Sequence, residues 1–312
     1  MGRVWLSHDV SGLTNRLPPG LSADVWDGRP PWPDTVGEVE LFVVPYLVGR
    51  PALAPIPEMT RLRVIQTLTA GYEDILPALP DGVTLCNARG VHDASTAELA
   101  VALTLASLRG FPDFVRAADA HEWATEHRPA LADRTVLIVG YGSVGSAIER
   151  RMAPFEVEIL RVARTARTTD SGAVHGFADL TRLLPQADVV VLSTPLTEQT
   201  RGLVDRSFLR TMRDGGLLVN VARGAVVDTQ ALLGELVSGR LTAALDVTDP
   251  EPLPPDHPLW SAPGLLLTPH VGGDTSAFVP RATKLVADQL RRFAAGEQLV
   301  NVVAGPGSTL RA

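Results

Sequence analysis

The chain has one cysteine and one lysine among its 312 residues. The single cysteine, Cys86, cannot form an internal disulfide bond, which fits a protein of the reducing cytoplasm. Because Lys284 is the only lysine among the 28 Lys and Arg residues, the Gly-Lys-Ser/Thr step of a Walker-type P-loop is absent. Schiff-base catalysis would depend on Lys284, whose sequence surroundings are typical of an amphipathic helix rather than of a catalytic pocket.

The sequence also lacks basic blocks, long apolar segments and metal-binding spacings. The formal net charge is -7, which argues against nucleic acid as the main partner. No apolar run approaches the ~18 residues of a membrane span, and the N-terminal MGRVWLSHDV lacks the pattern of a signal peptide. Neither His-Glu-x-x-His nor Cys-x-x-Cys occurs, so we expect no metal. These absences together favour a cytoplasmic protein without a nucleic-acid or membrane partner.

What the chain has instead is an alternation of short apolar runs with helical patterns. Most runs are apolar throughout, which is typical of parallel strands covered on both faces. Strands that alternate with helices favour α/β layers joined by right-handed crossovers. The expected strands are residues 39–44, 63–68, 83–87, 135–139, 157–163, 188–193, 216–222, 243–247 and 265–268.

A long helical pattern over residues 95–120 suggests where one unit gives way to the next. Ser95 or Thr96 is a candidate N-cap for this helix. Pro112 is expected to break or kink the helix, because proline lacks the backbone N–H and clashes with the preceding turn. A second helix is expected at about residues 276–295, ending before Gly296, and its pattern fits either unit. We predict one domain from residues 1–95 with 275–312 and another from residues 96–274.

The sharpest local signal is the glycine loop in TVLIVGYGSVGSAIERRM. Gly140, Gly142 and Gly145 form Gly-x-Gly-x-x-Gly after an expected strand and before an expected helix. The first glycine permits the tight turn, the second lets a pyrophosphate approach the backbone, and the third lets helix and strand pack closely. The helix N-terminus then offers free N–H groups to the phosphate. We interpret the loop as a dinucleotide-binding site; the alternative is a purely structural turn.

The strand after the glycine loop indicates which dinucleotide is bound. A carboxylate at its end would read the ribose 2′-hydroxyl of NAD, but the chain continues there as Val-Ala-Arg-Thr-Ala-Arg. Arg164 and Arg167 suit a 2′-phosphate instead, because a guanidinium is a permanently charged, forked donor. We therefore favour NADP over NAD; the alternative is that both arginines are ordinary solvated charges.

Three later strand ends each carry a chemically useful side chain. Arg223 follows the expected strand 216–222, and His270 follows the expected strand 265–268. Between them, Asp246 lies in the expected strand 243–247, and Glu251 comes after this strand. In a doubly wound sheet, ligands bind beyond the carboxyl ends of the strands. Each of these residue types is also common in structural roles. The hypothesis that the three form one site therefore depends on their order and their placement at strand ends.

Five motifs occur in order along the chain: GYGSVG at 140–145, STPLTEQTRGLV at 193–204, VNVARGAVVD at 219–228, ALDVTDPEPL at 244–253 and TPHVGG at 268–273. They resemble those of the D-isomer-specific 2-hydroxyacid dehydrogenases, whose members include glyoxylate/hydroxypyruvate reductases and phosphoglycerate dehydrogenases. The resemblance covers about residues 66–302, with looser matches at 66–75 and 96–109. It implies an α/β protein with two doubly wound parallel-sheet domains, a Rossmann cofactor domain and a flavodoxin-like substrate domain.

The resemblance also implies catalytic roles. Arg223 is expected to hold the substrate carboxylate and polarise the keto oxygen, His270 to be the acid/base, and Glu251 to hydrogen-bond His270. This agrees with the chemistry, because hydride attack on a ketone builds negative charge that an imidazolium can neutralise with a proton. A neighbouring carboxylate favours the charged form of an imidazole. Asp246 is expected to hold the nicotinamide carboxamide.

Further binding residues and a dimer follow from the same resemblance. Thr69, Ala70 and Gly71 are expected to bind substrate through backbone N–H groups, together with Arg223 and His270. The family usually forms a homodimer through its nucleotide domain. The expected cofactor-binding residues are Tyr141, Gly142, Ser143, Val144, Arg164, Thr165, Arg167, Thr194, Pro195, Thr200, Val221, Ala222, Asp246, His270 and Gly272.

The predicted activity is the NADPH-dependent reduction of a small 2-oxo acid to the D-2-hydroxy acid, with NAD as a further possible cofactor. Formate dehydrogenases resemble the same scaffold but carry glutamine as the partner of the histidine, whereas this chain has Glu251. An alternative is a cofactor-sensing interaction protein, because the C-terminal-binding protein corepressors share the three catalytic-type residues. Oxidation of a phosphonate or phosphite on this scaffold is a third interpretation.

Overall fold

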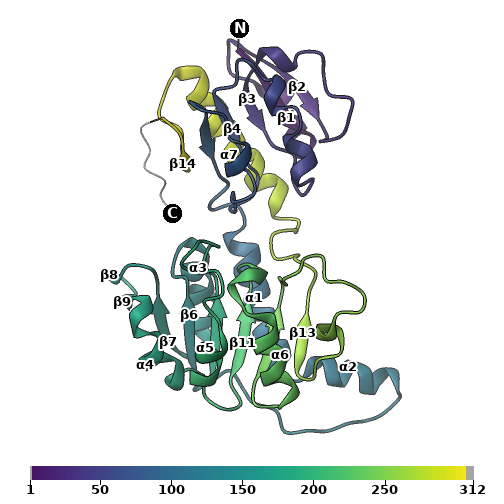
Figure 1. The fold of residues 1–312 in the computed structure, drawn as a ribbon, viewed down its shortest axis with the longest axis vertical. Helices are drawn as coiled ribbons and strands as arrows, with labels where there is room; N and C mark the ends of the chain where they lie inside the picture. Colours follow the sequence, from purple (N-terminus) through teal and green to yellow (C-terminus); the bar gives the residue numbers. More distant parts are fainter. Residues whose placement is uncertain (1, 307–312) are drawn as a thin grey trace. The chain divides into compact units, whose positions relative to one another are not determined.

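The computed structural model describes residues 2–306, and the chain divides into two compact units (Figure 1). Unit 1 contains residues 1–92 and 275–312, and unit 2 contains residues 93–274. The sequence analysis placed the first change of domain at residues 95/96, and the units of the structure change at residues 92/93. The second change, at residues 274/275, has the same position in both.

Unit 1 is built on a six-stranded sheet with the strand order β14-β5-β4-β3-β1-β2. All neighbours are parallel except β14, which runs antiparallel to β5 at one edge. A 3₁₀ segment follows β1, and α7 packs on the sheet with its buried Phe278, Ala282 and Val286. The elements are β1 (Gly2–Ser7), β2 (Leu21–Trp26), β3 (Val39–Val43), β4 (Val64–Gln66), β5 (Thr84–Cys86), α7 (Phe278–Ala295) and β14 (Val302–Ala304).

Unit 2 is built on a fully parallel six-stranded sheet with the order β13-β12-β11-β10-β6-β7. The chain runs from β6 outward to β7 and then returns to β10 on the other side of β6, so the switch point lies between β6 and β10. The strands are β6 (Thr135–Val139), β7 (Glu158–Val162), β10 (Val189–Leu192), β11 (Leu217–Asn220), β12 (Thr242–Leu245) and β13 (Leu265–Leu267), with a β8 (Arg167–Thr169) and β9 (Gly172–Val174) hairpin beside them. The helices are α1 (Asp93–Leu108), α2 (Phe111–Asp119), α3 (Ser143–Met152), α4 (Leu180–Leu183), α5 (Arg206–Thr211) and α6 (Thr229–Val237).

Both faces of the unit 2 sheet are covered, which explains why its inner strands consist mainly of apolar residues. On β6, Leu137 and Val139 belong to one apolar cluster with α5 and α6. Val136 and Ile138 belong to a second cluster with α1 and α3. Successive strand residues point to opposite faces, so an inner strand that is buried on both sides is apolar at consecutive positions, as β6 and β10 are. The predicted α/β class with two doubly wound sheets is confirmed.

Five strands were missing from the sequence prediction. β1 and β2 escaped it because Leu21–Trp26 contains Ser22 and Asp24 and lies half-exposed at the sheet edge, and because β1 starts at Gly2 without a preceding turn signal. The β8 and β9 hairpin has three residues in each strand, too few for a hydrophobic period. The antiparallel β14, also three residues long, was missed for the same reason.

The long helical pattern at residues 95–120 forms two helices rather than one. The chain turns at Gly110, which has a φ of 68° in the left-handed region, and Pro112 lies in the first turn of α2. Pro112 therefore breaks the pattern as predicted, at a position where its missing N–H costs nothing. The predicted N-cap was wrong, because α1 begins at Asp93 and contains Ser95 and Thr96. The final helix ends at Ala295 before Gly296, as expected, and belongs to unit 1.

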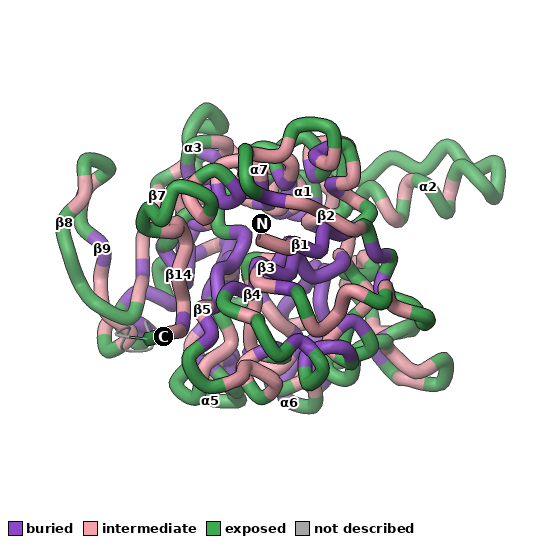
Figure 2. The backbone as a smooth tube through the Cα atoms, turned by 90° about the horizontal axis from the view of Figure 1, so that it is seen from above, coloured by how far each residue is buried: buried purple, intermediate pink, exposed green. Residues whose placement is uncertain are grey.

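Helix α2 stands out because none of its residues is buried (Figure 2). Phe111 and Val115 on this helix are 55% and 60% exposed, and Trp123 after it is 96% exposed. The helix is strongly amphipathic by sequence, yet its apolar face has no cover within unit 2. Across residues 2–306, no helix has the length and apolar character needed to cross a bilayer.

A buried ionic cluster links α3 to β7 behind the glycine loop. Glu149 of α3 accepts hydrogen bonds from the hydroxyl of Tyr141 and from the guanidinium of Arg161 on β7; its Oε2 lies 2.8 Å from Nε of Arg161. Only 8% of Glu149 is exposed. Burial opposes ionisation of Glu149, but the bonds from Arg161 and Tyr141 outweigh it and hold the pKa of this carboxyl below its usual value.

We expect Glu149→Gln to lower the free energy of unfolding by about 2 kcal/mol at pH 7, because it leaves the buried Arg161 charge uncompensated. Since the pKa of Glu149 is lowered in the folded state, its stabilisation is complete above the ordinary carboxyl pKa of about 4.3 and is lost as the pH falls through the lowered value. The difference between the two proteins, measured by urea unfolding, should therefore shrink between about pH 5 and pH 3. The exposed Glu122→Gln is the matched control, and an equal cost of Glu149→Gln at both ends of this range would contradict the ionic interpretation.

Candidate active site

Arg223, Glu251 and His270 follow three adjacent parallel strands of unit 2. These strands are β11, β12 and β13, which neighbour one another in that order. Because the strands are parallel, their carboxyl ends meet at one edge of the sheet, and the three residues follow these ends. This placement is a direct consequence of the strand order, which the sequence pattern alone does not determine.

His270 and Glu251 are in direct contact. Nδ1 of His270 lies 2.5 Å from Oε1 of Glu251, and the side chains are 42% and 40% exposed. Glu251 is held in turn by the backbone N–H of Thr248, 3.4 Å from its Oε2. Since an ionised carboxylate can only accept, Nδ1 of His270 carries the hydrogen, and Nε2 is the ring nitrogen left to exchange a proton with a ligand.

The electrostatics of Glu251 support its ionised form. Partial burial alone would raise the pKa of Glu251, but the hydrogen bond from His270 and the positive charges of His270 and Arg223 outweigh that effect. The pKa of Glu251 is therefore held below its usual value. The positive charge of Arg223 therefore stabilises the ionised form of the same carboxylate that His270 contacts.

The backbone around Arg223 is fixed by a buried amide. Asn220, at the end of β11, donates from Nδ2 to the carbonyl of Arg223 at 3.0 Å and accepts at Oδ1 from the N–H of Ala222 at 3.0 Å. The Arg223 guanidinium donates to the carbonyl of Ala222 at 2.8 Å. The next residue, Gly224, packs so closely that a Cβ there would lie 1.9 Å from the carbonyl oxygen of Thr248. The loops carrying Arg223 and Glu251 are thus in backbone contact.

Asp246 holds the loop that carries His270. Its side chain is 3% exposed, and Oδ1 accepts from the hydroxyl of Thr268 at 2.6 Å and from the N–H of Val271 at 2.9 Å. Oδ2 accepts from the N–H of Gly272 at 2.9 Å. His270 has a φ of 54°, in the left-handed region, and its own N–H donates to the Asp246 carbonyl at 2.7 Å. The Asp246 carboxylate therefore supports the unusual backbone turn at His270.

The glycine loop has the geometry that a dinucleotide needs. A Cβ at Gly140 would lie 2.4 Å from the backbone nitrogen of Thr194, and one at Gly145 would lie 2.6 Å from the Gly140 carbonyl, so both positions admit only glycine. At Gly142 nothing lies within 4 Å of such an atom, which leaves room for a phosphate to approach the backbone. No side chain caps α3, so its first N–H groups face this space. The loop therefore fits a dinucleotide.

The arginines after β7 differ in how they are held. Arg167 donates from Nη2 to the carbonyl of Tyr141 at 2.5 Å, which brings its charge beside the glycine loop. Arg164 and Thr165 are exposed, and the guanidinium of Arg164 has no hydrogen bond or ion pair within residues 2–306. The Tyr141 side chain is buried toward Glu149, so only the backbone of Tyr141 can serve a ligand.

The remaining predicted cofactor residues lie at the start of α3 and in loops after β10, β11 and β13. Thr194 packs against Gly140, and the Thr200 hydroxyl donates to the Pro195 carbonyl at 2.6 Å, closing its own loop. Ser143 and Val144 open α3 beside the glycine loop. The last three, Val221, Ala222 and Gly272, are buried at the strand ends.

The predicted substrate loop, Thr69–Gly71, lies in unit 1 after β4. Its three carbonyl groups each accept a hydrogen bond from unit 1, whereas the N–H groups of Ala70 and Gly71 donate to nothing within residues 2–306. These two N–H groups are therefore not used by the fold within the described residues.

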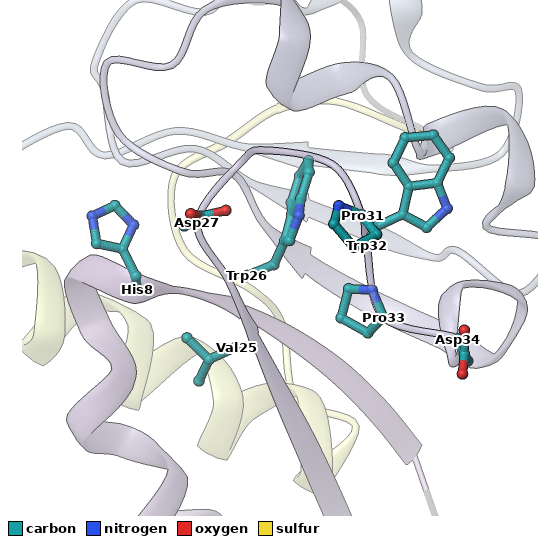
Figure 3. A pocket seen from close by; sticks show the side chains of 8 residues that line it. All are labelled: His8, Val25, Trp26, Asp27, Pro31, Trp32, Pro33 and Asp34. Carbon is teal, nitrogen blue, oxygen red and sulfur yellow. The ribbon is translucent and has the colours of Figure 1, made fainter.

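Sequence reasoning missed Asn220 and Gly224 because both lie inside an apolar segment that reads as strand and turn. Their signal was present in VNVARG, since a polar amide at the end of a buried strand needs partners. Unit 1 also carries a hollow of about 530 Å³ that contains no predicted site residue (Figure 3). Within residues 2–306, no three His, Cys, Asp or Glu side chains cluster as metal ligands would. The hollow is lined by His8, Val25, Trp26, Asp27, Pro31, Trp32, Pro33 and Asp34.

Comparisons with known proteins agree with this geometry. A family model described as "D-isomer specific 2-hydroxyacid dehydrogenase, NAD binding domain" matches residues 101–272. The chain is 34% identical over 250 residues to the glyoxylate reductase/hydroxypyruvate reductase of Mus musculus, covering 76% of each protein. It is 33% identical over 318 residues to the glyoxylate reductase of Korarchaeum cryptofilum, covering 96% of this chain and 95% of that protein.

A similar solved structure is that of an NADPH-dependent glyoxylate/hydroxypyruvate reductase from Sinorhizobium meliloti in complex with NADP and sulfate. The TM-score is 0.83 with 26% sequence identity, covering 97% of this chain and 98% of that one. The similarity therefore extends over both units of the chain.

We expect Asp246→Asn to lower the free energy of unfolding by about 2 kcal/mol in the absence of any ligand, because an amide N–H₂ would face N–H donors at Val271 or Gly272. Chemical denaturation of the ligand-free protein measures this effect. If the carboxylate of Asp246 served only to bind a cofactor, Asp246→Asn would not lower the free energy of unfolding of the ligand-free protein. The exposed Asp170→Asn is the matched control and should leave stability unchanged.

Proposed function

The chain belongs to the D-isomer specific 2-hydroxyacid dehydrogenase family, and from this premise we propose that it reduces a small 2-oxo acid of the glyoxylate or hydroxypyruvate type to the D-2-hydroxy acid, with NADPH as the preferred cofactor. The observation that carries the proposal is the contact between His270 and Glu251, with the charge of Arg223 acting on the same carboxylate. The names of the relatives support the choice of substrate class.

His270 is the proposed general acid. Glu251 holds Nδ1, which leaves Nε2 as the nitrogen that donates a proton as negative charge develops on the keto oxygen. In the reverse direction the same nitrogen accepts the hydroxyl proton of the 2-hydroxy acid. The bound nicotinamide supplies or accepts the hydride, and the residues of the chain position the substrate and move its proton.

Arg223 is the donor proposed for the substrate carboxylate in unit 2. Its forked pair of N–H groups suits a carboxylate and also stabilises charge on a neighbouring keto oxygen. In unit 1, the N–H groups of Ala70 and Gly71 are proposed as carboxylate donors. A 2-oxo acid carries both a carboxylate and a ketone for such donors, which a simple ketone does not.

NADP is the proposed cofactor, held at the glycine loop with the 2′-phosphate beside Arg164 and Arg167. The support is the missing carboxylate at the end of β7, the free guanidinium of Arg164 and the tether of Arg167 to Tyr141. Asp246 would meet the nicotinamide carboxamide, and the loops at Thr194 and Ala222 would line the dinucleotide. The solved relative that carries NADP supports the same preference.

The assembly we propose is a cytoplasmic homodimer in which a second copy covers the apolar side chains of α2. Phe111, Val115 and Trp123 are exposed large apolar residues on or next to this helix. Burying them against the same surface of another copy would remove apolar area from water, in the isologous manner of a two-fold dimer.

Initial rates with glyoxylate, hydroxypyruvate and phenylpyruvate, each with NADPH and with NADH, test the proposal. We expect NADPH-dependent turnover that is fastest with one of the two small acids. Cofactor binding without turnover of any substrate would contradict it and would favour a cofactor-sensing protein.

The control that ties turnover to the site is His270→Ala. It should lower kcat by at least ~10², the scale of a positioned general acid. Turnover that stays near the wild-type rate would remove His270 from the mechanism.

Arg164→Asp should reverse the cofactor preference. Loss of a guanidinium from the 2′-phosphate should raise the KM for NADPH by about tenfold or more, while the new carboxylate can accept from the 2′-hydroxyl of NADH. The measurement is kcat/KM for both cofactors. Arg210→Asp makes the same charge change at another exposed arginine of unit 2 and should change neither value. An unchanged ratio in Arg164→Asp would show that Arg164 does not read the phosphate.

A further inference from the structure

Buried amide and hydroxyl side chains lie directly behind the loop Thr69–Gly71 in unit 1. Gln66 is 0% exposed, Gln289 1%, Thr67 1% and Asn87 7%. We propose that this network, through Asn87, is a positioning device that aims the N–H groups of Ala70 and Gly71 at the substrate carboxylate. The proposal rests on the proposed function, because it concerns the loop to which that function assigns the carboxylate.

Each carbonyl of the loop is held from inside unit 1. The Thr69 carbonyl accepts from the N–H of Ala88 at 2.8 Å and from the Thr67 hydroxyl at 2.7 Å. The Ala70 carbonyl accepts from Nδ2 of Asn87 at 2.7 Å. The Gly71 carbonyl accepts from the Thr69 hydroxyl at 2.7 Å. Three consecutive peptide groups are therefore fixed without regular secondary structure.

Peptide planarity converts these bonds into an orientation of the N–H groups. In a trans peptide, the C=O of one residue and the N–H of the next point in opposite directions. Holding the Thr69 and Ala70 carbonyls toward their donors therefore turns the N–H groups of Ala70 and Gly71 the other way. Ala70 is exposed and Gly71 is half-buried, so neither residue is enclosed by unit 1.

Asn87 is itself fixed at each of its polar groups. Its N–H donates to the Asn301 carbonyl at 3.0 Å, and its Oδ1 accepts from the N–H of Arg89 at 3.2 Å. Its own carbonyl accepts from Nε2 of Gln66 at 3.2 Å. Because Nδ2 and Oδ1 both have partners of the correct kind, the side chain has one favourable orientation, with Nδ2 toward Ala70.

The network continues from Gln66 to helix α7. Oε1 of Gln66 accepts from Nε2 of Gln289 at 2.7 Å, and Oε1 of Gln289 accepts from the N–H of Val300 at 2.9 Å. A fully satisfied buried network defines one arrangement of the groups that it joins. The loop is therefore pre-organised, and the substrate does not have to order it on binding.

Positioning of this kind makes a specific kinetic prediction. Backbone N–H groups bound to the carboxylate act alike in the ground state and the transition state, so their misalignment raises KM and leaves kcat nearly unchanged. A general loss of folded protein lowers the apparent kcat instead, because fewer active molecules remain.

The test is Asn87→Ser, which shortens the side chain and removes the donor to Ala70. We expect the KM for glyoxylate to rise about tenfold, and the dissociation constant of oxalate, titrated calorimetrically into the NADPH-loaded protein, to rise by the same factor. The change in kcat should stay below about threefold, and the dissociation constant of NADPH should be unchanged. Thr67→Val removes only one of two donors to Thr69 and should give a smaller rise, about twofold to threefold.

Thr35→Val is the matched control. It deletes a hydroxyl of unit 1 that bonds to Asp24 and Trp5 and has no bond to the loop, so it should change stability without changing KM. Suppose that the wild-type protein turns over substrate, and that both Asn87→Ser and Thr67→Val keep its KM and its affinity for oxalate. This result would overturn the positioning role and leave the proposed function intact. Absence of wild-type turnover and of oxalate binding would overturn the proposed function itself. If Asn87→Ser does not fold, Thr67→Val decides between these outcomes.

Discussion

The Asp246 carboxylate is the interaction on which the candidate site depends. It is buried at the end of β12 and accepts three hydrogen bonds, from the Thr268 hydroxyl and from the N–H groups of Val271 and Gly272. These bonds hold the loop after β13 in a turn that places His270 at a positive φ, with its ring against Glu251. Without an anionic acceptor here, the N–H donors of Val271 and Gly272 would lose their partners, and the backbone turn that brings the His270 ring to Glu251 would lose its support.

In each unit, a buried asparagine holds the backbone of a loop that follows a parallel strand. A loop that follows a parallel strand has no ladder partners for its backbone, so a buried polar side chain supplies them. Asn220 holds the carbonyl of Arg223 in unit 2, and Asn87 holds the carbonyl of Ala70 in unit 1. In both loops, the group proposed to bind substrate lies next to the carbonyl that the asparagine holds. The asparagine supports the loop, and a different residue is proposed to bind.

The sequence predicts those features that depend on local patterns, and less of those that depend on tertiary partners. The apolar strands of unit 2, the break at Pro112 and the α/β class follow from hydrophobic runs and turn chemistry, and the structure confirms them. The strands β1 and β14 owe their place to neighbours far away in the chain, which no window of residues reveals. The site follows a similar division. His270 and Glu251 are visible as strand-end residues, whereas the support by Asp246 and Asn87 depends on hydrogen bonds across 17 to 26 residues of separation.

The three arginines near β7 differ in whether their charge is available to a ligand. Arg161, Arg164 and Arg167 all lie on or after this strand, yet Arg161 is neutralised by Glu149 inside the fold and offers nothing to a ligand. Arg167 keeps its charge beside the glycine loop through the Tyr141 carbonyl, which is a dipole and not a counter-ion. Arg164 remains with its full charge in solvent. Of the three positive charges beside β7, two are therefore accessible to a ligand: Arg167, which is already oriented, and Arg164, whose side chain is exposed.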